Sequence, residues 1–181
     1  MYKKDNYIIL TGAPGVGKTT LIAELKKKGI FCVDEPARKI IAEQRLIEGD
    51  AVPEKRSDLF SNLLLSRSIQ LYKYYLDRKD IVVFDRGIAD SYAYAKLFGL
   101  NTKVFENSAR IYLSNKNIFI LPPWEDIYRT DDERKMSFYD SKIFHKYFIE
   151  IYNKLDCNLI EVPCVSVEDR CRFVVKKMIT Y

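Results

Sequence analysis

The sequence predicts an α/β fold in which helices cover both faces of a parallel β-sheet. Along the 181 residues, short apolar runs alternate with longer segments whose apolar residues recur at helical spacing. The run at 81–84, Ile-Val-Val-Phe, has no polar break, as expected of a strand that is covered on both faces. Five such runs separated by helices indicate a three-layer sandwich, and the length suits one domain.

Five short apolar segments are expected to form the strands. The first runs into a glycine-rich loop, the second follows Gly29, and the fourth is ended by Pro122 and Pro123. The predicted strands are 7–10, 30–33, 81–84, 117–121 and 158–162.

Seven segments have the periodicity of helices. In the first, Leu21, Ile22 and Leu25 fall on one face, and Gly29 closes the helix. Ser166 has the position of an N-cap for the last helix, with acidic residues in the following turn. The predicted helices are 18–28, 37–48, 54–79, 89–98, 103–114, 137–155 and 167–179.

The composition excludes several classes of protein. With 48% hydrophobic and 30% charged residues the chain is an ordinary globular sequence, not a disordered one. No apolar run approaches the roughly 18 residues of a membrane span, and the N-terminus does not resemble a signal peptide. The formal net charge of +5 suits an anionic ligand, and no basic-aromatic stripe favours nucleic acid. We therefore expect a cytoplasmic protein that binds no membrane and for which a small anionic ligand is favoured over nucleic acid.

The four cysteines do not predict a metal site. Cys32, Cys157, Cys164 and Cys171 form no C-x-x-C pair, and the chain has one histidine, His145. We expect reduced thiols, mostly in the core, and a structural histidine.

The clearest chemical motif lies between the first strand and the first helix. Gly-Ala-Pro-Gly-Val-Gly-Lys-Thr fits the phosphate-loop pattern G-x-x-x-x-G-K-S/T at every defined position. Glycines let backbone N–H groups turn toward an anion, and the helix N-terminus adds positive potential. Lys18 is expected to bridge the terminal phosphates from an exposed position without packing against other groups, and Thr19 to contact Mg²⁺. The predicted nucleotide-binding residues are Gly12, Ala13, Pro14, Gly15, Val16, Gly17, Lys18, Thr19 and Thr20.

A second motif, Asp85-Arg86-Gly87, follows the buried third strand. Ligands of parallel sheets bind at the carboxyl ends of the strands, so Asp85 is a candidate for the hydration shell of Mg²⁺. Arg86 is a candidate for contacting a phosphate or orienting the acceptor. An N-capping aspartate beside a solvent-exposed arginine is the alternative.

A third motif, Asp34-Glu35-Pro36-Ala37-Arg38, follows the second strand. Glu35, ahead of Asp34, is the candidate general base toward an acceptor hydroxyl, and Arg38 is a candidate substrate contact. Pro36 suits the first turn of a helix, so simple capping is the alternative.

The charged segment after the fourth strand is the candidate lid, at about 124–136. A mixed-charge loop is usually solvated, but arginines that close over phosphates stabilise charge and exclude water. Arg134, ahead of Arg129, is the candidate lid arginine.

Several residues give weaker signals. Asp90 is interpreted as a surface residue, and Arg67 and Gln70 either line an acceptor pocket or face solvent. The tyrosines of the third and fourth helices are interpreted as packing residues.

With these motifs in order, the chain resembles the small AAA-type ATPase/kinase-like P-loop family (AAA domain 28), which is related to the ribosylnicotinamide kinase domain and to deoxynucleoside and thymidylate kinases. Glu35-Pro36-Ala37-Arg38 resembles the Glu-Pro-x-Arg segment of that group. Asp85-Arg86-Gly87 resembles its Asp-Arg-Gly segment, whereas the lid lacks the usual glycine at Asp132-Glu133-Arg134. The ending, Val162-Pro163 and then 167–170, resembles the region near which adenine packs in related kinases. The resemblance implies the strand order 2-3-1-4-5 and Glu35 as the base.

The leading functional hypothesis is a Mg²⁺-dependent kinase that transfers the γ-phosphate of ATP to a hydroxyl of a small, nucleoside- or nucleotide-like molecule. Its catalytic residues are expected to be Lys18, Glu35, Asp85, Arg86 and Arg134, with Glu35, Arg38 and Arg86 facing the substrate. A nucleotide-binding regulator that acts through a partner, and a kinase of nucleic-acid ends, are the alternatives. The acceptor and the oligomeric state stay open, a homodimer included.

Overall fold

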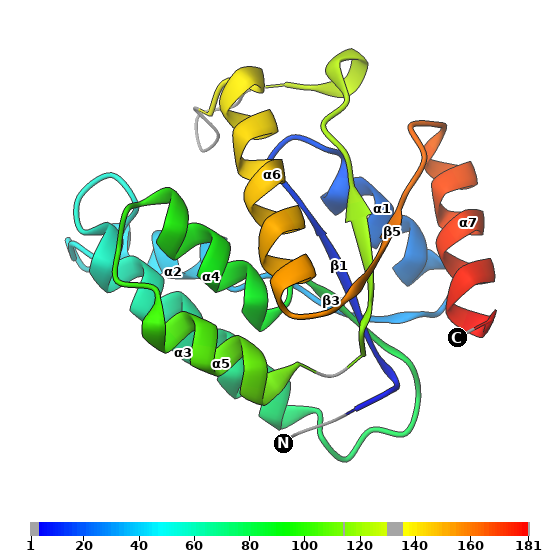
Figure 1. Cartoon of the computed structure of the whole chain (residues 1–181), viewed down its shortest axis with the longest axis horizontal. Helices are drawn as coiled ribbons and strands as arrows, with labels where there is room; N and C mark the ends of the chain where they lie inside the picture. Colours follow the sequence, from blue (N-terminus) through cyan, green and yellow to red (C-terminus); the bar gives the residue numbers. More distant parts are fainter. Residues whose placement is uncertain (1–3, 114, 130–135, 181) are drawn as a thin grey trace.

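A five-stranded parallel sheet in the order β2-β3-β1-β4-β5 forms the centre of the molecule (Figure 1). The computed structural model describes residues 4–113, 115–129 and 136–180. The strands are β1 Tyr7–Gly12, β2 Phe31–Val33, β3 Val82–Asp85, β4 Asn117–Leu121 and β5 Asn158–Glu161. The predicted fold class and strand order are confirmed.

Helices cover both faces of this sheet. On one side α1 packs against α7, and on the other α4 contacts α3, α5 and α6 (Figure 1). The helices are α1 Lys18–Lys27, α2 Ala37–Leu46, α3 Ser57–Tyr74, α4 Ile88–Leu97, α5 Lys103–Tyr112, α6 Phe138–Lys154 and α7 Val167–Thr180. A 3-10 turn, η1 Glu125–Ile127, follows β4.

The longest predicted helix is shorter at both ends than its periodicity indicated. Expected over 54–79, α3 begins only at Ser57, because Lys55 and Arg56 donate their amides back to the carbonyl of Val52 in a turn. At the other end, Arg78 donates its amide to Tyr75 in another turn. Apolar spacing alone did not separate these turns from the helix.

The two-sided cover accounts for the apolar strands. All six residues of β1 are buried, and Val82 and Val83 of β3 are fully inaccessible. The Tyr7 hydroxyl, buried in this core, donates to the carbonyl of Tyr72 on α3. Among the described cysteines, all free, Cys171 is buried, Cys32 and Cys157 pack against the core, and Cys164 is exposed.

The strand register brings the candidate motifs to one edge of the sheet. Val33 pairs with Phe84, Leu10 with Asp85, and Gly12 with Leu121. The loops that leave β1, β2, β3 and β4 therefore start side by side at the carboxyl edge, where ligands of such sheets bind. Within the described residues, no helix combines the length and apolar character needed to cross a bilayer.

Candidate active site

The loop between β1 and α1 has three glycines with positive φ. The values are +149° at Gly12, +85° at Gly15 and +80° at Gly17, a region that residues with a Cβ rarely adopt. At Gly12 a Cβ would also stand 2.7 Å from the carbonyl oxygen of Leu121 on β4. Backbone conformation thus explains the three glycines, and at Gly12 the close approach of β4 adds a second steric reason.

The segment after β4 lies against this loop. A Cβ on Gly15 would stand 2.5 Å from the Tyr128 ring, so the ring rests directly on the glycine. From α6, the Ser141 hydroxyl donates to the Pro14 carbonyl at 3.2 Å. The first part of the expected lid therefore covers the loop. Arg134, the candidate lid arginine, lies outside the described residues.

Lys18, the first residue of α1, forms an ion pair with Asp85 at the end of β3. The side chains are only 8% and 10% exposed. The expectation that Lys18 is exposed and packs nothing is therefore wrong, since adjacent strands bring a carboxylate within reach. Thr19 and Thr20 are exposed on the first turn of α1.

Arg86 occupies the centre of the site. Its Nη1 donates to the Gly12 carbonyl at 2.8 Å, and its Nε lies 2.8 Å from Glu35 Oε1. The second contact is an ion pair without a well-directed hydrogen bond, and neither atom has another partner. Arg86 also has a φ of +75°, a conformation that costs a non-glycine residue about 1–3 kcal/mol and concentrates at functional sites.

The charges around Arg86 favour its protonated form. Burial opposes the charge, but the carboxylates of Glu35, Asp90 and Asp85 outweigh burial, and the pKa of Arg86 is raised. The rings of Tyr94 and Phe148 lie 5.5 Å from its guanidinium. Arg86 is thus a fixed cation between the phosphate loop and Glu35.

Asp90 was missed by the sequence interpretation, which placed it on the surface. It is 2% exposed and accepts hydrogen bonds from Tyr152 at 2.7 Å and Thr11 at 2.9 Å. It also accepts from the amide of Gly87 at 3.2 Å, as an acid does three residues after an N-cap. That spacing was the available signal. Burial raises the pKa of Asp90 to about 6, partly offset by Arg86, Tyr152 and Thr11.

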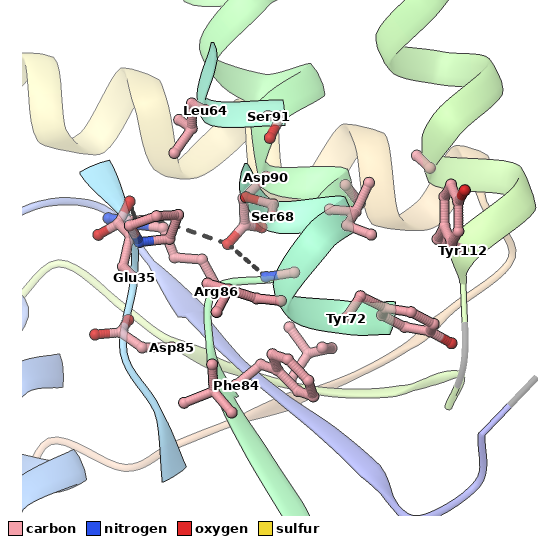
Figure 2. Close-up of a pocket in the computed structure, with 18 of the residues that line it drawn as sticks. Glu35, Leu64, Ser68, Tyr72, Phe84, Asp85, Arg86, Asp90, Ser91 and Tyr112 are labelled. Carbon is pink, nitrogen blue, oxygen red and sulfur yellow. Dashed lines mark hydrogen bonds and ion pairs between the residues drawn. The ribbon is translucent and has the colours of Figure 1, made fainter. Parts of the chain in front are cut away.

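A pocket opens beside these charged groups (Figure 2). The empty space between its lining residues amounts to about 680 Å³ when the open solvent at its mouth is counted. Glu35, Asp85, Arg86 and Asp90 line one end, and Ser68 and Ser91 add hydroxyls. Aromatic and aliphatic side chains line much of the remainder, among them the following from β3, α3, α5 and the residue after α5: Phe84, Leu64, Leu71, Tyr72, Ala109, Tyr112 and Leu113.

The other candidate residues lie at the rim of this pocket or outside it. Asp34 is at the rim and pairs at 2.6 Å with Lys26, and Arg38 is exposed on α2 outside the lining. Arg67 and Gln70 face a separate groove between α2 and α3. Arg67 and Gln70 therefore do not line the pocket that contains Glu35.

Arg170 on α7 is a further cation at the phosphate loop, to which the sequence interpretation gave no role. It is 6% exposed, its Nη1 donates to the Val16 carbonyl at 3.2 Å, and its guanidinium lies 5.5 Å from the Trp124 ring. Burial lowers the pKa of Arg170. An arginine one turn into a closing helix gives no local signal, since its partner is 154 positions away.

The oxygen ligands near Lys18 suit a magnesium ion that keeps most of its water, and not an ion that is bound by protein side chains alone. In the described part of the chain, no three His, Cys, Asp or Glu side chains converge as metal ligands. Mg²⁺ usually keeps several waters and takes one or two protein oxygens beside substrate phosphates. Thr19 follows Lys18 in the chain and Asp85 pairs with it, and the Thr19 hydroxyl and the Asp85 carboxylate can supply such oxygens.

The fold and this site define a P-loop protein. A family model described as an AAA domain matches residues 7–170, and the chain belongs to that family. A comparison with curated proteins found no match.

Solved structures of a deoxyadenosine kinase and of NadR share the fold. A deoxyadenosine kinase from M. mycoides, with products dCMP and dCDP bound, is 19% identical with a TM-score of 0.67, and the alignment covers 97% of this chain and 100% of that one. A second structure of this kinase, with bound dATP, is 17% identical with a TM-score of 0.67 and coverages of 96% and 98%. The NadR protein in complex with NR is 19% identical with a TM-score of 0.68, and the alignment covers 99% of this chain and 52% of NadR.

Proposed function

We propose that the protein is a Mg²⁺-dependent kinase that transfers the γ-phosphate of ATP to a hydroxyl group of a small, nucleoside-like molecule. The observation that carries the proposal is the double role of Asp85, which pairs with the phosphate-loop lysine and also lines the pocket that contains Glu35. A phosphate held at Lys18 and a small molecule in the pocket would therefore be neighbours, as group transfer requires.

The phosphate loop would hold the triphosphate. Its backbone amides and Lys18 suit phosphate oxygens, and the Asp85 carboxylate and Thr19 hydroxyl suit the hydration shell of Mg²⁺. The ion would neutralise charge on the phosphate oxygens during transfer. Nucleotide binding would give Lys18 a phosphate partner and leave Asp85 free to face the ion.

The pocket would hold the acceptor. Glu35 lines it, and the ion pair of its Oε1 with Arg86 Nε holds the side chain in place, so that the carboxylate can accept a hydrogen bond from an acceptor hydroxyl and then take the proton. Arg86 would fix the orientation of Glu35 and of the first residue of the phosphate loop. The apolar wall suits a flat, uncharged group such as a nucleobase.

The comparisons are consistent with this substrate class, because the similar folds include a deoxyadenosine kinase seen with dATP and NadR seen with NR. Arg134 is proposed as the lid arginine that stabilises the transferring phosphoryl group. A cytoplasmic location stays a prediction.

The test is ADP release from Mg·ATP with and without a panel of nucleosides and related metabolites. A kinase is stimulated by its acceptor and forms a phosphorylated product in equal amount to ADP. A regulatory nucleotide-binding protein hydrolyses ATP slowly and at the same rate with every member of the panel, and that result would reject the kinase assignment.

A further inference from the structure

A buried arginine lies against the phosphate loop without an acidic partner. Arg170 is 6% exposed, and its Nε has no hydrogen-bond partner. Over the residues that the structure describes, no carboxylate lies within ion-pair distance of it. The neighbouring Asp169 is engaged with Ser166 and Arg172. Burying an unpaired cation lowers the stability of the folded state, which suggests that Arg170 has a function at the groups it contacts.

The neighbour of this cation is the peptide that joins Val16 to Gly17. Arg170 Nη1 donates to the Val16 carbonyl at 3.2 Å, and it lies 2.9 Å from the position that a Cβ on Gly17 would take. The peptide is trans, since the described chain has no cis bonds. In a trans peptide the C=O and N–H point in opposite directions, so the Gly17 N–H points away from Arg170.

The arginine thereby sets the direction of one amide of the anion-binding loop. Gly17 has a φ of +80° and no side chain that could fix it. A charged donor on the carbonyl also polarises the peptide and makes its N–H a stronger donor. The planar guanidinium is held in turn between this peptide and Trp124, 5.5 Å from the ring centroid.

We propose that Arg170 is a positioning residue of the nucleotide site, which orients and polarises the Val16–Gly17 peptide so that its N–H binds a phosphate oxygen. This inference rests on the proposed function only in requiring that the loop binds a polyphosphate. Arg170 acts on the phosphate end of the ligand and not on a base, so inorganic tripolyphosphate is a sufficient probe.

The test compares Arg170→Met and Arg170→Lys with the parent by calorimetric titration of Mg·ATP and of Mg·tripolyphosphate. Hydrogen bonds that involve charge are worth about a 10- to 100-fold change in affinity. We expect Arg170→Met to raise Kd by that factor for both ligands alike. Arg170→Lys keeps the charge and one donor and should recover part of the loss, which a purely space-filling role would not predict. If Arg170→Met does not fold, Arg170→Lys is compared with the parent instead. Its Kd should then rise by the same factor for both ligands, and by less than the factor expected for Arg170→Met.

Arg172→Met is the matched control, because Arg172 is on the same helix, is 70% exposed and pairs with Asp169. It should leave both Kd values unchanged. A loss of ATP affinity without a loss of tripolyphosphate affinity would assign Arg170 to the base and overturn the proposal. Unchanged affinities in a folded variant, whatever its melting temperature, would overturn it too. Failure of the parent to bind either ligand would instead reject the proposed function.

Discussion

Single residues in this site neutralise one another in pairs, Lys18 with Asp85 and Arg86 with Glu35. All four side chains are less than one-fifth exposed. Removing one member of such a pair leaves the other as an uncompensated charge in a poorly solvated place. Substitutions here therefore report on stability as well as on activity.

The Lys18–Asp85 pair can be separated from catalysis by a double-mutant cycle. Lys18→Ala should abolish nucleotide turnover and also lower the free energy of unfolding, by an amount of the order of 3 kcal/mol, because Asp85 loses its partner. In the Asp85→Ala background the same change should cost much less. Urea denaturation of the four proteins measures the coupling, and strictly additive losses would show that the pair does not stabilise the fold.

Glu35→Gln tests the base. The amide keeps the shape of the side chain but cannot take a proton, so acceptor phosphorylation should fall by about 10²- to 10⁴-fold while ATP affinity stays close to the parent value. Asp34→Asn is the adjacent control, since Asp34 is exposed and paired with Lys26. Steady-state rates with a saturating acceptor decide: full activity in Glu35→Gln together with loss in Asp34→Asn would transfer the role to Asp34.

Elements meet at the phosphate loop through glycines that leave no room for a Cβ. Tyr128 follows η1 and rests on Gly15, whereas Gly29, at the end of α1, has the similar φ of +79° and nothing within 4 Å. Substitutions at Gly29 therefore test backbone strain alone, whereas substitutions at Gly15 test strain together with the contact between the loop and Tyr128.

Gly29→Ala should therefore cost only the strain of a left-handed residue, about 1–2 kcal/mol. Gly15→Ala should cost more, because the Tyr128 ring must also move. Thermal denaturation of both variants measures the difference. In a Tyr128→Ala background the excess at Gly15 should disappear, and an excess that persists would mean that the ring does not restrict the loop.

The lid is the element whose role depends most on the proposal. Arg134→Ala should reduce both acceptor phosphorylation and slow ATP hydrolysis, because both pass through the same charged phosphoryl group. A transition-state arginine is worth about 10³- to 10⁵-fold, so the loss should exceed that of Glu35→Gln. Arg129→Ala is the control from the same segment, its Nη1 donating to the Tyr128 carbonyl. Single-turnover rates measure the loss in each variant. Equal losses would mean that Arg134 has no special role in stabilising the transferring phosphoryl group.

At the scale of the whole molecule, the sequence was sufficient to predict the sheet and the edge of the sheet at which the candidate site lies. Unbroken apolar strands and the rule that ligands bind at their carboxyl ends placed Glu35, Asp85 and Arg86 at one edge, and the register shows why they meet. Partners distant along the chain could not be predicted. Arg170 reaches back to Val16, and Asp90 accepts from Thr11 and Tyr152, through packing that no local pattern encodes.

Asp90 joins β1, α4 and α6, and its protonation should make the stability of the whole fold depend on pH. The pKa is about 6 in the folded protein against an ordinary value of 3.8, with burial as the main cause. As pH rises from 4 to 6, the unfolded chain gives up this proton, while the folded chain keeps it until the pH approaches 6. The unfolded state is thereby favoured, and the free energy of unfolding should fall by about 2 kcal/mol across this window.

Asp90→Asn removes the titrating group, so its free energy of unfolding should vary less between pH 4 and 6 than that of the parent. The slope is the informative quantity, because asparagine also changes the hydrogen bonds with Thr11 and Tyr152 at every pH. Asp156→Asn is the control: the hydrogen bond from Lys116 lowers the pKa of Asp156, so its contribution is complete above its ordinary pKa and leaves this window unaffected. Urea denaturation at pH 4, 5 and 6 measures the three slopes. Parallel curves for the parent and Asp90→Asn would mean that Asp90 is already ionised at pH 4, with Arg86, Thr11 and Tyr152 fully offsetting its burial.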